Sequence, residues 1–250
     1  MTTPNPAIKG PGILFVQSAI SRPDIMDYDT YMKWYDEDHI DEIIHTDAIK
    51  SAFRYINTSP DAKKPYLAFY PMEDIAFTQG ERFRKIRVHS DLLPGSGLCY
   101  DLADIDVRYC GLVRKTEAKS TEPAAYVLVT GIEPGTSQSG SDVEAYVSGE
   151  QIEAISKLQG YIRTTRFKLL YARTNAQSRA LKGLPTTDEP NPEPPTHLSL
   201  HEFERDPSRD ELTRALESGN GKKIFSEAKE VETHIYKIAK AHGAKKFFEE

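Results

Sequence analysis

The sequence has few cysteines and no excess of positive charge, and each shortage excludes a class of protein. Cys99 and Cys110 are the only cysteines among 250 residues. Two thiols cannot form a disulfide scaffold, so we expect a reducing compartment. The 38 acidic side chains outnumber the 32 basic ones, for a net charge of -6. Binding to nucleic acid through phosphate neutralisation is therefore not expected.

Long apolar runs and short catalytic motifs are also missing. No segment approaches the roughly 20 apolar residues of a membrane span, and residues 1–12 lack the apolar core of a signal peptide. No glycine-rich phosphate loop, nucleophile elbow or zinc-ligand spacing occurs. We expect a cytoplasmic protein without a membrane or nucleic-acid partner and without a metal site.

A repeat of about 112 residues is the clearest feature that is present. Short β-prone segments alternate with segments of helical periodicity in the order βαββαβ, the ferredoxin-like unit, and this order occurs twice. Residues 126–130 match 13–17 at an offset of 113, and 161–171 match the second strand at an offset of 112. The expected strands are 13–17, 49–57, 66–70, 104–114, 126–130, 161–171, 197–203 and 232–239. The expected helices are 27–46, 73–92, 142–158 and 209–230, the last with a break at 219–221.

The repeat predicts an α+β fold of two tandem ferredoxin-like units. A single such sheet covers one face with helices and leaves the other apolar face open, so the two antiparallel sheets should pack together into a pseudo-dimeric α/β barrel. We expect a tail over 1–11 and repeats over 12–120 and 121–250. The proline-rich insertion 175–195 is either a disordered surface loop or a lid over the pocket. The chain would be a monomer with an internal pseudo-dimer, or a homodimer.

Three short segments of the first half resemble the signature of the EthD-type dimeric α/β-barrel proteins. They are Trp-Tyr-Asp-Glu-Asp-His at 34–39, Asp-Ala-Ile at 47–49, where that family usually has Pro-Gly-Phe, and Phe-Arg-Tyr at 53–55. The resemblance implies a barrel that is usually cofactor-free and often belongs to secondary metabolism. The broader superfamily includes polyketide cyclases, cofactor-independent monooxygenases, dehydratases, decarboxylases and lactone isomerases. We therefore expect no cofactor, although a haem ligand stays open because aldoxime dehydratases share the fold.

His39 is the sharpest candidate for chemistry. It lies at helical spacing with Tyr28, Met32 and Tyr35, so its ring should face the sheet. Burial lowers the pKa of an imidazole and a nearby carboxylate raises it, and either shift can suit proton transfer near neutral pH. The alternative is a hydrogen-bonded core histidine that braces the helix end. In the second half Gln151 occupies the equivalent position, so a single site would belong to the first half.

Two further side chains join His39 as candidate catalytic residues. Tyr70 on the third strand could donate its phenol to a carbonyl or enolate oxygen, although core filling is the commoner role of such a tyrosine. His89 lies in a region from which cyclase-like relatives can supply a histidine to the same cavity, although an exposed or capping role is the alternative. Aromatic residues are the expected substrate-binding lining: Trp34, Tyr35, Phe53 and Phe83.

The sequence predicts a cofactor-free acid/base enzyme, a lyase or isomerase such as a cyclase, dehydratase or decarboxylase. Its substrate would be a hydrophobic, oxygenated small molecule, polyketide- or phenol-like, in secondary metabolism. Two alternatives stay open. One is a cofactor-independent monooxygenase on the same fold, and the other is a non-catalytic ligand-binding or stress-response barrel.

Overall fold

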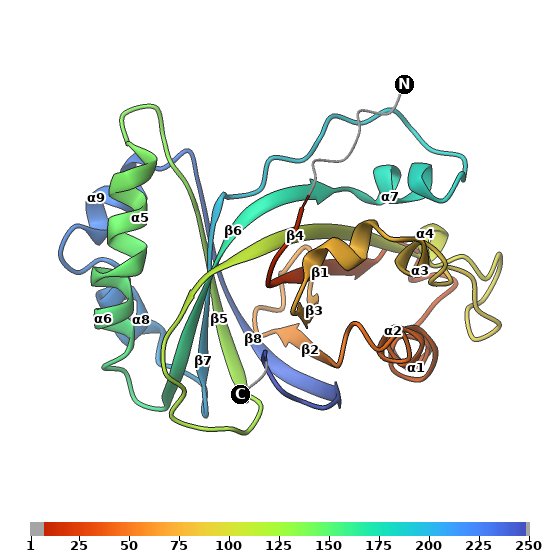
Figure 1. The fold of residues 1–250 in the computed structure, drawn as a ribbon, viewed down its shortest axis with the longest axis horizontal. Coiled ribbons are helices and arrows are strands. Elements are labelled where there is room, and N and C mark those ends of the chain that lie inside the picture. The colour runs from red at the N-terminus through yellow and green to blue at the C-terminus, as the bar shows by residue number, and fades with distance from the viewer. Residues whose placement is uncertain (1–7, 249–250) are drawn as a thin grey trace.

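Eight antiparallel strands close into a barrel in the computed structural model, which describes residues 8–248 (Figure 1). Around the barrel the order is β1-β3-β2-β8-β5-β7-β6-β4. The first-half strands are β1 (Gly12–Ile20), β2 (Ser51–Asn57), β3 (Tyr66–Met72) and β4 (Ala103–Lys115). The second-half strands are β5 (Tyr126–Glu133), β6 (Tyr161–Arg173), β7 (His197–Phe203) and β8 (Glu230–Gly243).

Each half of the barrel has the strand order of a ferredoxin-like sheet. The first half reads β4-β1-β3-β2 and the second reads β8-β5-β7-β6. The outer strands of the halves then pair with each other, β2 with β8 and β4 with β6, so neither sheet keeps an open edge. The predicted α+β fold of two sheets in a pseudo-dimeric α/β barrel is confirmed, with hydrogen-bonded edges closing it.

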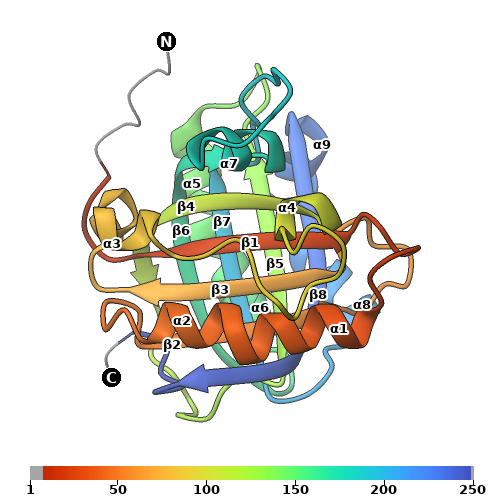
Figure 2. The same ribbon diagram turned by 90° about the vertical axis from the view of Figure 1, so that its right-hand side faces the viewer.

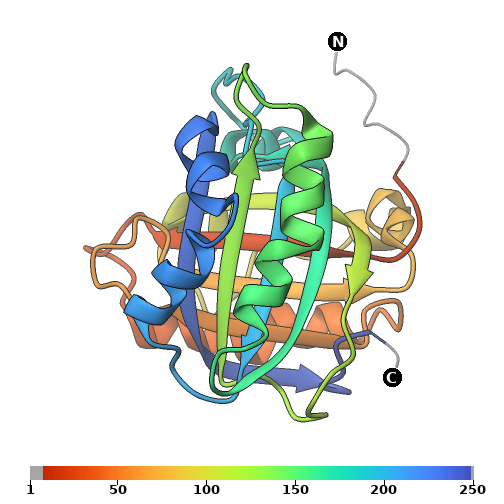
Figure 3. The same ribbon diagram turned by 90° about the vertical axis from the view of Figure 1, so that its left-hand side faces the viewer.

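Helices cover the barrel on two opposite sides. On the first half a continuous helical stretch runs through α1 (Tyr28–Trp34), η1 (Tyr35–His39) and α2 (Ile40–Ile44), over the outside of β2 and alongside β3 (Figure 2). On the second half α5 (Gly140–Ser148), α6 (Glu150–Ile155), α8 (Arg209–Leu216) and α9 (Gly221–Glu227) cover β5 and β7 (Figure 3). The expected break at 219–221 separates α8 from α9. Among residues 8–248 no helix has the length and apolar character needed to cross a bilayer.

The long helix expected over 73–92 does not form. Only the 3-10 turn η2 (Ile75–Gln79) and the short α3 (Glu81–Arg84) occupy that range, and α4 (Cys99–Leu102) follows after irregular chain. Gly80 has extended backbone, with φ -78° and ψ 165°, and separates η2 from α3. Gly95 and Gly97 both adopt positive φ in the turn before α4, a conformation that favours glycine. The glycines therefore determine the conformation of this segment, and its weak helical periodicity does not.

The insertion 175–195 begins with a capped helix, α7 (Asn175–Leu181). Thr174 and Gln177 form a reciprocal capping box at its start, which satisfies the free amide groups of the first turn. The remaining residues run without regular structure into β7. At the other end of the chain, residues 1–7 of the expected tail lie outside the described residues, and Ile8 is already buried.

The core forms three layers because strand residues alternate between the two faces of each sheet. Ile13, Phe15 and Val127 belong to the cluster inside the barrel. Leu14 and Leu128 face the helices of the first and second halves respectively. Residues that face the same side in the first strands of the two halves, such as Ile13 and Val127, are therefore 114 positions apart and not 113. A shift of one residue would place every side chain on the opposite face of the sheet.

Candidate active site

A π-helical turn sets the shape of the candidate site. Tyr35–His39 is π-helical, and the amide of Ile40 donates to the carbonyl oxygen of Tyr35, five residues earlier. On an α-helix Trp34 and His39 would lie about 140° apart, but a π-helical turn brings residues i and i+5 together. The rings of Trp34 and His39 are indeed stacked, with centroids 4.9 Å apart and planes 19° apart. Single π-helical turns of this kind are frequent at functional sites.

His39 is held neutral, and one of its ring nitrogens is buried without a partner. Its side chain keeps partial exposure, yet its Nδ1 atom is buried without any hydrogen-bond partner. Burial lowers the pKa of His39 to about 4, while the Asp38 carboxylate raises it and the Lys182 ammonium lowers it. The ring is therefore uncharged at neutral pH, with one nitrogen that no protein group satisfies. The core-histidine alternative requires the hydrogen bond that Nδ1 lacks.

Tyr70 lies on β3 and points toward the helical stretch, into the same cluster as Trp34 and Tyr35. It pairs with Leu14 on β1, and Leu14 in turn pairs with Tyr109 on β4, so the three side chains form one row across the helix-facing side. Tyr70 is buried, and its hydroxyl lies close to the Tyr35 phenol. Burial raises the pKa of the phenol well above its ordinary value, so Tyr70 keeps its proton and is a hydrogen-bond donor.

An ion pair fixes the π-helical turn to the sheet. Arg54 on β2 donates from Nε and Nη2 to the two oxygens of Asp36, both at 2.8 Å. His242 on β8 also contacts Asp36, at 3.1 Å. Burial alone would raise the pKa of Asp36, but hydrogen bonds from His242 and Arg54, together with the Arg54 charge, hold it well below its usual value. This bidentate pair positions the turn that carries Trp34 and His39.

The second half also contributes to this layer. The end of β6 pairs with β4 and places Tyr171 beside Tyr109, with ring centroids 5.6 Å apart. The helix α7 follows directly and lies on the first-half side of the barrel (Figure 1). Lys182 donates to the carbonyl oxygens of Arg84 and Ile86, at 2.6 and 2.7 Å. The insertion thus closes over the first half, which the repeat pattern alone does not predict.

The predicted site residues do not all lie in one cluster. Trp34, Tyr35 and Tyr70 belong to one cluster and Phe83 packs at its edge, with His39 stacked on Trp34. Phe53 lies inside the barrel instead, because its neighbour Arg54 takes the helix-facing position on β2. His89 is exposed and makes a backbone bridge with Leu98.

A second buried histidine was assigned no role from sequence. His201 on β7 pairs with Leu128, as Tyr70 pairs with Leu14, so it takes the place of Tyr70 in the second half. Both of its ring nitrogens have hydroxyl partners, Thr164 at 2.8 Å and Thr130 at 3.3 Å. Burial lowers the pKa of His201 to about 3. The second half therefore carries a bonded histidine on the sheet and Gln151 on the helix.

Comparisons with known proteins agree with the fold. No protein-family model matches the sequence. Core atranone cluster (CAC) protein 1 of Stachybotrys chlorohalonatus is 23% identical over 215 residues, covering 79% of this chain and 84% of that protein. The crystal structure of an anthrone oxidase-like protein gives a TM-score of 0.56 at 13% identity, over 96% of this chain and 95% of that one.

A variant of chlorite dismutase from Candidatus Nitrospira defluvii gives a TM-score of 0.53 at 12% identity, over 93% of this chain and 92% of that one. At such identities structural likeness establishes the fold alone, here that of the dimeric α/β-barrel proteins. The finer resemblance to the EthD type stays a prediction.

Proposed function

We propose that this protein is a cofactor-free enzyme in which His39 removes a proton from a hydrophobic, oxygenated, polyketide- or phenol-like small molecule. One observation carries the proposal: the Nδ1 atom of His39 is buried without a partner, in the layer that also holds the Tyr70 hydroxyl. A buried polar group that no protein atom satisfies costs about 1–3 kcal/mol. A planar ligand with a polar group could stack in this layer and bond that nitrogen.

The two groups have complementary roles in proton abstraction. The neutral imidazole of His39 can accept a proton, and the phenol of Tyr70 can donate a hydrogen bond to the oxygen on which negative charge develops. Although the lowered pKa makes free His39 a weak base, the imidazolium that forms would lie beside the new enolate. That opposite charge favours the protonated ring when the substrate is bound.

The fate of the carbanion separates two reaction classes. Cyclisation, dehydration, isomerisation or decarboxylation would proceed by acid/base chemistry alone. Alternatively, an anthrone-type enolate reduces dioxygen, forms a carbon–oxygen bond to give a hydroperoxide, and loses water to give a quinone. One dioxygen is consumed for each quinone, and no other reductant is needed. The shared fold with an anthrone oxidase-like protein favours this second candidate, and the relative from the core atranone cluster is consistent with either product class in secondary metabolism.

The role of His39 can be tested without knowing the natural substrate. Under argon in deuterated buffer, wild-type protein should speed the exchange of the acidic C–H of a dihydroxyanthrone. The His39→Gln variant should be slower by about 10²–10⁴-fold, the usual contribution of a positioned base. His45→Gln, at an exposed position on the same helical stretch, serves as the matched control and should exchange at the wild-type rate.

Repeating the reaction in air then distinguishes the oxygen-consuming reaction from acid/base chemistry alone. Dioxygen uptake equal to quinone formation, above the enzyme-free rate and lost in His39→Gln, supports the oxygen-consuming reaction. Exchange under argon without dioxygen uptake in air supports acid/base chemistry alone. Exchange that is equally fast in wild type and His39→Gln would reject His39 as the base.

A further inference from the structure

One half-buried arginine lacks the partner that the fully buried arginines have. Each of those four is bound to a carboxylate, as expected for a charge removed from water. These pairs are Arg54–Asp36, Arg108–Glu232, Arg163–Glu202 and Arg166–Glu144. Arg173, at the end of β6, makes no ion pair with any residue in the described range 8–248. Its Nε atom is buried without an acceptor.

The polar surroundings of Arg173 are mostly hydrogen-bond donors. Its Nη2 atom donates to the hydroxyl of Tyr109, and its guanidinium lies 5.1 Å from the centre of the Tyr109 ring. Because Tyr109 accepts this bond, its own hydroxyl hydrogen is free to donate. Ser178, in α7, is 1% exposed, and its hydroxyl lies against the Tyr100 phenol. A cation and two hydroxyl groups thus lie together without a negative group to bind.

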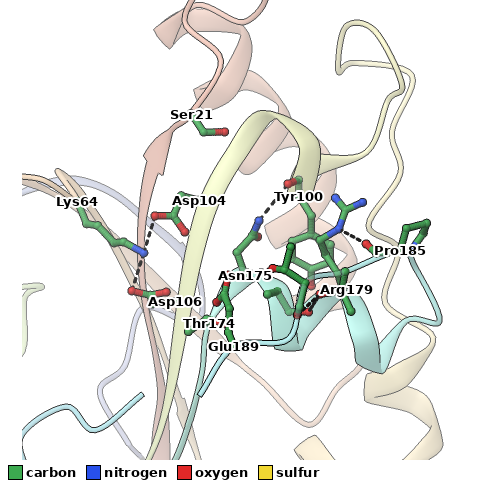
Figure 4. Close-up of a pocket in the computed structure, with 13 residues that line it drawn as sticks. Ser21, Lys64, Tyr100, Asp104, Asp106, Thr174, Asn175, Arg179, Pro185 and Glu189 are labelled. Atoms are coloured by element: carbon green, nitrogen blue, oxygen red, sulfur yellow. Dashed lines mark hydrogen bonds and ion pairs between the residues drawn. The ribbon is translucent and has the colours of Figure 1, made fainter. Parts of the chain in front are cut away.

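Tyr100 places these donors beside an open cavity. Burial raises the pKa of Tyr100, whereas the Arg173 charge and a hydrogen bond with the Ser178 hydroxyl lower it. Tyr100 and Asn175 line a cavity of about 750 Å³ between β4 and the insertion, and the Asn175 amide donates to the Tyr100 carbonyl (Figure 4). Such a volume suits a small organic molecule. Thr174, the residue after Arg173, also lines the cavity, so the cavity adjoins the end of β6.

Two of the three carboxylates that line the cavity are neutralised by a lysine. Asp104 and Asp106 both bind Lys64, at 3.0 and 2.5 Å, on the side of the cavity away from Tyr100 (Figure 4). The third, Glu189, accepts from the Thr187 hydroxyl at 3.2 Å. Arg179 pairs with Asp101, whereas Arg173 has no carboxylate partner in the described range and Lys182 binds two carbonyl oxygens.

We propose that Arg173, Tyr109 and Ser178 form an anion-binding subsite for an ionised oxygen, as in a phenolate or a carboxylate. The bound molecule would be the substrate of His39, and in that respect the inference rests on the proposed function. Tyr109 and Tyr70 flank Leu14 on one row of the sheet, so they are two strand spacings apart, about 10 Å. A fused two- or three-ring aromatic molecule can span that distance, with its acidic carbon at His39 and its ionised oxygen at Arg173.

Two matched probes test the subsite: an anthraquinone carboxylate and the corresponding neutral anthraquinone methanol. Trp34 is the single tryptophan of the chain, so its quenching reports binding in this layer. Wild type should bind the carboxylate more tightly than the alcohol. Arg173→Gln should weaken the carboxylate about tenfold or more, as expected for a lost charged hydrogen bond, and leave the alcohol unchanged. Arg114→Gln, which removes an exposed arginine, should change neither.

Each other outcome is decisive. Equal binding of both probes by wild type would overturn the inference, as would an equal loss of both in Arg173→Gln, which would show a merely structural role. If Arg173→Gln does not fold by circular dichroism, Ser178→Ala must weaken the carboxylate selectively. His39→Gln should still bind the carboxylate while its deuterium exchange is lost. Failure of the subsite and failure of the proposed function are therefore seen in different measurements.

Discussion

The neutral state of buried His39 makes a quantitative prediction about stability and pH. Burial lowers its pKa from 6.5 to about 4 in the folded protein. Above pH 6.5 both folded and unfolded chains carry a neutral ring, so the group has no effect. Between these two values the unfolded chain binds a proton that the folded chain does not, and the free energy of unfolding falls as the pH falls.

The expected loss follows from the two pKa values. At about pH 4.5, relative to pH 7, His39 should reduce the free energy of unfolding by about 2.4 kcal/mol. This is an upper value, because the partial exposure of the ring lets water stabilise the protonated form. Urea unfolding of wild type and His39→Gln at the two pH values measures it. Glutamine is the matched replacement because Gln151 occupies the same place in the second half.

The comparison isolates His39 because every other titrating group is common to both proteins. Wild type should lose about 2 kcal/mol more than His39→Gln on acidification, whatever the two proteins' stabilities at pH 7. His45→Gln should lose as much as wild type. If wild type and His39→Gln lose the same amount, His39 is not held neutral by burial, and the basis for its role as a base is removed.

The strands were predictable because their signal is local. Alternating apolar residues with turn residues between them mark all eight, and the ferredoxin-like order then fixes their neighbours. The second helix of the first half was not predictable in the same way. Its range contains Gly80, and Gly95 and Gly97 follow the range before α4, so the spacing of its apolar residues does not produce a long helix.

The site was only partly predictable, and the misses have physical causes. A π-helical turn adds a residue that steps of three and four cannot reveal, so the sequence does not predict that His39 stacks on Trp34. Tyr28, expected on the buried stripe, is 44% exposed because it is the first residue of α1. Phe53 was expected in the lining, but Arg54 takes the helix-facing position to reach Asp36. The acidic residues of the helix were the signal that could have placed Arg54 on the helix-facing side of β2, and so Phe53 inside the barrel.

The contribution of the insertion could not be read from its sequence. Arg173 and Ser178 lie in the second half, and neither belongs to a motif. They reach the first-half layer only because β6 pairs with β4 and carries α7 across the boundary between the repeats. An asymmetric site thus arises from a symmetric fold, since β4 and the end of β6 bring second-half residues to the side that carries His39.

Three further substitutions test separate parts of this arrangement. Tyr70→Phe removes a hydroxyl whose neighbour is the Tyr35 phenol, so the melting temperature should change little while turnover falls about tenfold or more; a large loss of stability would contradict this. Lys182→Met removes the amine that binds two carbonyl oxygens after α3, so amide hydrogen exchange should speed up in α7 and not in the barrel. Arg54→Met leaves the carboxylate of Asp36 half-buried without its bidentate partner and should cost about 3 kcal/mol in urea unfolding. Adding Asp36→Asn removes the half-buried charge that Arg54 no longer neutralises, so the double variant should be more stable than Arg54→Met alone. Strictly additive losses would show that the pair does not hold the π-helical turn on the sheet.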